Sequence, residues 1–130
     1  MDEKLYKNED FYRHLAHLFY AFAAADRKIV IEEKRSIVAS VEKNWTLHTD
    51  EFDAKEIIYS TMRKIIEGKL DKDLAFLSFE QFYTHHHEQF SYELKGKILT
   101  AADDITLAFA HRNKSELVLL ARLGLLFAHA

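Results

Sequence analysis

Residues 10–25 read DFYRHLAHLFYAFAAA, and this stretch decides the fold class of the 130-residue chain. Four apolar side chains recur in it at the three- and four-residue spacing of one helix face: Phe11, Leu15, Leu18 and Phe22. We therefore expect an amphipathic helix that begins at about Asn8 or Asp10 and ends at Ala25. Its apolar face should lie in the core of the protein.

The remainder of the chain also predicts helices. It has no proline and only three glycines, so the residues that usually separate strands and hairpins are missing. We expect further helices over residues 31–45 and from a Thr49 or Asp50 cap to just before Gly68. Another should cover residues 71–90 with a break near Ser78, and two more should run from a Ser91 cap to about Ala110 and from a Ser115 cap onward. The predicted fold is an all-α, compact bundle of six or seven helices.

Composition restricts the kind of protein. With 130 residues and no cysteine, the chain fits one domain with its own core and without disulfides or thiolate metal sites. The formal net charge is −3 and basic residues are interleaved with acids, so we expect no nucleic-acid partner. The N-terminus is too polar for a signal peptide, and the most apolar run, residues 117–130, is too short to span a bilayer. We therefore expect a cytoplasmic protein without a transmembrane segment.

Two acids flank the turn after the first predicted helix, in the stretch AAADRKIVIEEKRSI (residues 23–37). Asp26 follows Phe22 by four residues, and Glu33 precedes Ile37 by four. Residues four apart share a helix face. Both acids are therefore expected at the inner edge of a helix pair.

Three interpretations of this acid pair remain open. In the first, Glu33 and Asp26 cap the start of the second helix, because Val30 has no side-chain oxygen for that role. In the second, they bind a hard divalent cation with help from carbonyl groups or water. An EF-hand is excluded, since apolar residues occupy its first ligand positions and Arg27 replaces its glycine. In the third, the two acids are the general acid and base of an uncharacterised hydrolase, although no nucleophile is visible nearby.

A faint two-fold internal repeat extends the pattern. The segments FAAADRKIVIEEKRSIV (residues 22–38) and LAFAHRNKSELVLLA (residues 107–121) both show a helix end of small residues, a basic turn, a glutamate and an apolar helix. In this alignment His111 takes the place of Asp26, and Glu116 takes the place of Glu33. The candidate metal ligands are therefore these four residues: Asp26, Glu33, His111 and Glu116.

The stretch around Asp26 resembles the A-A-D-G-x-I-x-x-x-E signature of the tellurite-resistance TerB-like family. Ile29 and Glu33 match it, and the preceding HLFYAFA is similar to the aromatic-and-alanine helix of that family. Arg27 stands where the family has glycine, and Val30 stands where it has Ser or Thr. The resemblance implies an all-helical module, similar to the N-terminal region of a membrane-anchored DnaJ-type co-chaperone, that acts in stress responses and binds divalent metal through its acids. When the site residues of the family are transferred position by position, only Asp26 and Glu33 match.

The eight histidines give a separate metal hypothesis. His85, His86 and His87 are consecutive, so on a helix they point about 100° apart and cannot converge on one ion. His86 lies on the apolar stripe of its predicted helix and is expected to be partly buried. His14 and His17 lie one turn apart and offer two ligands, but the sequence signals no third. The spacings exclude the ligand patterns of haemerythrin-like and ferritin-type di-iron bundles.

We expect the chain to act by binding a protein partner and not by catalysis, since no nucleophile elbow, phosphate loop or zinc-protease motif is present. A membrane-associated partner and a homo-oligomer are both open alternatives. The alternative function is that of a divalent-metal-binding or metal-sensing protein. A self-association patch is also expected if not all of these four tyrosines pack into the core: Tyr12, Tyr20, Tyr59 and Tyr92.

Overall fold

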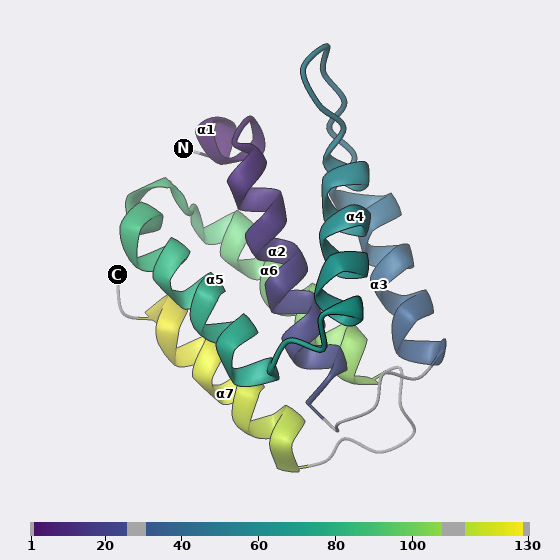
Figure 1. The fold of residues 1–130 in the computed structure, drawn as a ribbon. Helices are drawn as coiled ribbons and strands as arrows, with labels where there is room; N and C mark the ends of the chain where they lie inside the picture. The colour runs from purple at the N-terminus through teal and green to yellow at the C-terminus, as the bar shows by residue number, and fades with distance from the viewer. Residues whose placement is uncertain (1, 26–30, 108–113, 129–130) are drawn as a thin grey trace.

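A computed structural model describes residues 2–25, 31–107 and 114–128, and this part of the chain is an all-α bundle (Figure 1). The prediction of six or seven packed helices is confirmed, because the described residues form seven α-helices. Their bounds are Asp2–Tyr6 (α1), Glu9–Ala23 (α2), Ile31–Asn44 (α3), Ala54–Glu67 (α4), Lys72–His86 (α5), Tyr92–Leu107 (α6) and Lys114–Ala128 (α7). A 3-10 turn, His87–Gln89, follows α5, and the β pairing in the described residues is limited to one bridge between His48 and Asp53.

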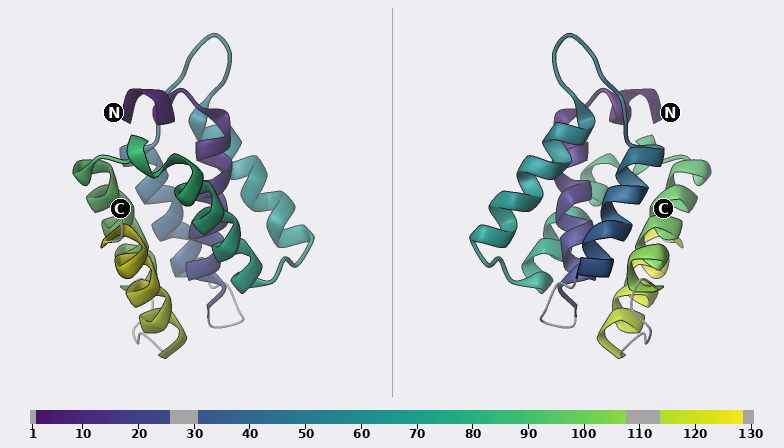
Figure 2. Two further views of the ribbon diagram at one scale, coloured as in Figure 1. Left: turned by 90° about the vertical axis from the view of Figure 1, so that its left-hand side faces the viewer. Right: turned by 90° about the vertical axis from the view of Figure 1, so that its right-hand side faces the viewer.

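Helix α2 lies at the centre of the bundle, with its most extensive contacts to α5 and α4 (Figures 1 and 2). Ten of its 15 residues are buried, so it is covered on more than one side. Three alanines, Ala16, Ala21 and Ala23, are among them and leave room for neighbouring helices to approach. A helix that is apolar around most of its circumference is expected in the interior.

Aromatic side chains fill the core on both sides of α2. Phe11 of α2 contacts the rings of Trp45, Phe82 and Phe90, with ring centroids 5.9–6.3 Å apart. Such contacts join α2 to the end of α3, to α5 and to the turn before α6. Burying aromatic rings contributes a large share of the apolar stabilisation of a small domain.

Several predicted helix starts are confirmed. The side chain of Asn8 accepts a hydrogen bond from the backbone N–H of Asp10 at 2.9 Å and caps α2. The hydroxyl of Ser91 accepts one from the N–H of Leu94 at 3.1 Å and caps α6. These bonds satisfy backbone donors that have no partner within the helix.

The predicted start of the third long helix is wrong. Thr49 and Asp50 lie in the loop between α3 and α4, and Asp53 caps α4 by accepting a bond from the N–H of Lys55 at 3.0 Å. The hydroxyl of Thr49 instead accepts bonds from the N–H groups of Glu51 and Phe52, both at 3.1 Å. Thr49 therefore forms a local turn that ends before the helix begins.

Two more expectations about helix ends are wrong, and one helix was not predicted. Helix α5 is continuous through Ser78, because buried residues on one face continue across that position: Phe76, Phe79, Phe82 and Tyr83. Ser115 is the second residue of α7 and not its cap. Helix α1 is short and polar, but its Leu5 is fully buried and fixes it to the bundle.

The four tyrosines do not form one exposed patch. Tyr12 and Tyr20 are buried, and their hydroxyls donate to the carbonyl oxygens of Tyr6 at 2.7 Å and Leu70 at 2.5 Å. Tyr92 is 92% exposed. Tyr12 and Tyr20 are therefore not available for self-association, whereas a role for the exposed Tyr92 stays a prediction.

Candidate functional site

The structure describes one side chain of the predicted metal site. Asp26 and His111 lie outside the described residues, as does the side chain of Glu33, whose backbone belongs to the first turn of α3. Glu116 lies in the first turn of α7 and is only 2% exposed. Burial of a carboxylate is uncommon and costly without compensating contacts.

The helix ends that flank the two predicted turns lie at one end of the bundle. Figure 1 shows the end of α2, the start of α3, the end of α6 and the start of α7 together there. Helix α6 packs against both α3 and α7. Among the described residues, no group of three or more His, Asp or Glu side chains is arranged to hold a metal ion.

Histidine rings form a column with Phe82 between α2 and α5. His17 stacks against His14 with centroids 5.8 Å apart, His14 stacks on Phe82 at 4.6 Å, and Phe82 stacks on His86 at 4.1 Å. Each histidine donates its Nδ1–H to the backbone carbonyl four residues earlier, at 2.6–2.9 Å. The expected partial burial of His86 is confirmed. Burial lowers the pKa of His14, and the neighbouring His17 and His86 lower it further.

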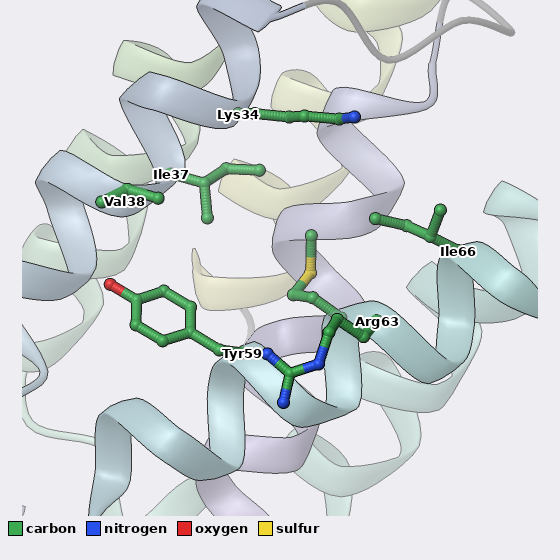
Figure 3. Close-up of a pocket in the computed structure, with 7 residues that line it drawn as sticks. Lys34, Ile37, Val38, Tyr59, Arg63 and Ile66 are labelled. Carbon is green, nitrogen blue, oxygen red and sulfur yellow. The ribbon is translucent and has the colours of Figure 1, made fainter.

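A groove between α3 and α4 was not predicted from the sequence. It has a volume of about 210 Å³, and Figure 3 shows side chains from the two helices pointing toward the space between them. Its lining residues are Lys34, Ile37 and Val38 of α3 and Tyr59, Met62, Arg63 and Ile66 of α4. Within each helix these positions follow the spacing of one face.

The groove forms because α3 and α4 pack mainly on different helices. The principal contacts of α3 are with α6, and those of α4 are with α2, so contact between α3 and α4 themselves is limited. The two helices are joined at the end near the connecting loop by Glu42, which accepts a bond from the Tyr59 hydroxyl at 2.8 Å and one from Lys55 Nζ at 3.2 Å. Away from this junction the helices diverge (Figure 1).

The floor of the groove is apolar and its edges are apolar and basic. Ile37 and Met62 are buried, whereas Val38 is 47% exposed and Ile66 is 38% exposed. The two charged lining residues, Lys34 and Arg63, are both cations. Arg63 makes one ion pair, with Glu56 at 3.5 Å, in which both side chains are mostly exposed. Burial and the hydrogen bond to Glu42 raise the pKa of Tyr59 to about 12, so this phenol stays neutral at physiological pH.

One signal in the sequence could have found this groove. Ile37-Val38 and Ile65-Ile66 are apolar pairs at adjacent positions, and adjacent residues on a helix point about 100° apart. The first member of each pair is in the core. The second therefore extends the apolar surface beyond the face that the bundle buries.

Comparison with known proteins does not assign this chain to a family. No protein-family model, curated protein or solved structure matches this chain. Among the described helices, none has the length and hydropathy to cross a membrane.

Proposed function

We propose that this chain is a TerB-like helical module that acts by binding a protein partner in a stress response. The single observation that supports binding best is the groove between α3 and α4, in which the apolar side chains of Val38 and Ile66 remain exposed. An exposed apolar surface with a polar edge is typical of a protein interaction site. The all-α fold and the TerB-like signature around Asp26 are compatible with this assignment.

The size of the groove favours a macromolecular partner over a small ligand. Its volume of about 210 Å³ is below the roughly 300–1,000 Å³ of typical small-molecule pockets. The groove is also open along one side and lined by few polar groups that could orient a small molecule. A partner that continues beyond the groove can bury more surface than the groove alone offers.

Site-specific photo-crosslinking in cells tests this function. A photo-crosslinking amino acid in place of Val38 should give a discrete adduct of higher mass, and cell fractionation should show whether the partner is membrane-associated. The matched control is Leu77 on α5, which is 41% exposed and does not line the groove. An adduct that forms equally from both positions, or from neither under stress and non-stress conditions, would reject the proposed function.

A second candidate function is binding of a divalent cation by Asp26, Glu33, His111 and Glu116. The observation that favours it is the burial of Glu116 in the first turn of α7. The start of α7 lies at the same end of the bundle as the other helix ends that flank the two predicted turns (Figure 1). Carboxylates in a shielded position are suited to hard cations such as Ca²⁺, Mg²⁺ or Mn²⁺, and a histidine extends the choice to Zn²⁺.

Thermal unfolding with added metal tests the second candidate. A cation at about 100 times its dissociation constant should stabilise the protein by roughly 2.7 kcal/mol. The Asp26→Ala, Glu33→Ala double variant should lose this increase. The Asp50→Ala, Glu51→Ala double variant removes two exposed acids of the α3–α4 loop and should keep it. Melting curves that no divalent cation shifts would eliminate metal binding.

A further inference from the structure

The groove between α3 and α4 has the shape of a binding site for a third helix. Its two walls are helix faces, one spaced i, i+3, i+4 over Lys34, Ile37 and Val38, and the other spaced i, i+3, i+4, i+7 from Tyr59 to Ile66. A helix laid between two diverging helices can insert its own apolar ridge into such a space. The longer wall extends for about 10 Å, or two helical turns.

Other modes of peptide recognition fit this groove less well. Addition of a strand needs a sheet edge. The described part of the chain has only the isolated bridge between His48 and Asp53, in the segment between α3 and α4, and neither residue lines the groove. Recognition of a polyproline segment uses a surface lined by several aromatic rings. Here Tyr59 is the one aromatic lining residue, and its hydroxyl is held by Glu42.

The charges around the groove specify the chemistry of the occupant. Lys34 lies on one wall and Arg63 on the other, and among the side chains that the structure describes no carboxylate lines the groove itself. The nearest acidic partner of Arg63 is Glu56, in an exposed pair of the weak kind that a competing carboxylate can replace. The chain as a whole has a formal charge of −3, so its general field repels an acidic partner. Selective binding of acidic groups would therefore have to arise locally, at these two cations.

We infer that the groove binds an amphipathic helix of a partner protein that presents apolar side chains at i, i+3 or i+4 and carboxylates on both flanks. The apolar side chains occupy the space between Val38 and Ile66, and the carboxylates pair with Lys34 and Arg63. This inference rests on the proposed protein-binding function and adds the class of partner to it.

Peptide binding tests this inference on the full chain. The probe is a fluorescently labelled helical peptide of about 14 residues, with leucines at i, i+3, i+4 and i+7 and glutamates on both flanks. Its counterpart has lysine in place of every glutamate. Fluorescence anisotropy should show that the acidic peptide binds at least about five-fold more tightly, as expected for two exposed charge pairs. The difference should decrease as salt is added.

Charge reversal shows whether the groove itself discriminates between the acidic peptide and the lysine peptide. The Lys34→Glu, Arg63→Glu variant should prefer the lysine peptide. The Lys4→Glu, Lys7→Glu variant has the same change in net charge on exposed residues at and after α1, and it should keep the preference for the acidic peptide. Val38→Glu should weaken binding of the acidic peptide, whereas Leu77→Glu should not.

The outcomes separate this inference from the function on which it rests. Equal binding of the two peptides, or a preference that the Lys34→Glu, Arg63→Glu variant does not change, would overturn the acidic-helix assignment. So would the absence of saturable binding by the acidic peptide while the crosslink from Val38 still forms, and in that case the protein-binding function stands. Loss of both the peptide binding and the crosslink would overturn both.

Discussion

The imidazole of His14 on α2 stacks on the phenyl ring of Phe82 on α5, with ring centroids 4.6 Å apart and planes inclined by 20°. The same contact lies within a column that includes His17 and His86. Because α2 and α5 form one of the two most extensive helix contacts of the bundle, His14 takes up its proton within a principal packing interface.

Stability should therefore fall when the pH is lowered. Burial, followed by the neighbouring histidines, lowers the pKa of His14 below its ordinary value, although its bond to the Asp10 carbonyl acts in the opposite direction. A lowered pKa in the folded state gives stability that is present above the unfolded value of about 6.5 and is lost as the pH falls through the folded value. Urea unfolding at about pH 7.5 and pH 5 should show the decrease.

Substitution of His14 tests the origin of this effect. His14→Gln should reduce the difference in unfolding free energy between the two pH values. His85→Gln is the control, because His85 is exposed and donates an equivalent bond to the Gln81 carbonyl at 2.7 Å. A His14→Gln variant with the pH dependence of the parent would show that His14 does not contribute to it.

Asp53→Ala should destabilise the protein by about 1 kcal/mol, because it removes the side-chain acceptor at the start of α4. The sequence pattern alone assigns that role to Thr49 or Asp50. Asp50→Ala changes an exposed residue of the preceding loop, and its effect should stay within about 0.5 kcal/mol. Chemical denaturation of the two variants distinguishes these assignments, and a larger loss from Asp50→Ala would contradict the observed cap.

Lys69→Gly should stabilise the protein by about 0.5 kcal/mol. Lys69 follows the last residues of α4 and has φ = 50°, the left-handed conformation that favours glycine. Part of the gain is offset by the greater freedom of glycine in the unfolded chain. Lys64→Gly, inside the same helix, should instead cost about 1 kcal/mol. Equal effects of the two substitutions in thermal unfolding would argue against the left-handed end of α4.

Phe11→Ala should destabilise the protein by about 3–5 kcal/mol, because Phe11 is fully buried among Trp45, Phe82 and Phe90. Tyr92→Ala removes an aromatic ring that is 92% exposed, and its effect should be within about 0.5 kcal/mol. Guanidinium unfolding curves provide the comparison. Comparable losses would mean that the aromatic core is not arranged around α2 as described.

Periodicity predicts the long helices because their apolar faces are what the bundle buries. Phe11, Leu15, Leu18 and Phe22 are all fully buried, as the spacing indicates. Periodicity does not predict helix α1, because its two core contacts, Leu5 and Tyr6, are adjacent in a short polar segment and form no helical repeat.

Local polar signals predict helix ends less well, because they compete with each other and with the core. The hydroxyl of Thr49 forms a turn instead of a cap, and the buried face of α5 continues past Ser78.

The candidate site depends on information that the sequence holds only indirectly. The groove exists because α3 packs on α6 while α4 packs on α2, and no spacing within either helix specifies that divergence. The apolar pairs Ile37-Val38 and Ile65-Ile66 indicate surplus apolar surface. They do not indicate that Val38 and Ile66 face one common space.

The most direct test of the account is to map where the acidic helical peptide contacts the protein. Backbone amide chemical shifts recorded during its addition should change mainly over residues 34–38 of α3 and residues 59–66 of α4, with saturation at the affinity measured by anisotropy. Shifts that cluster on α5 or α7 and leave both walls of the groove unchanged would contradict the assignment of this groove as the binding site.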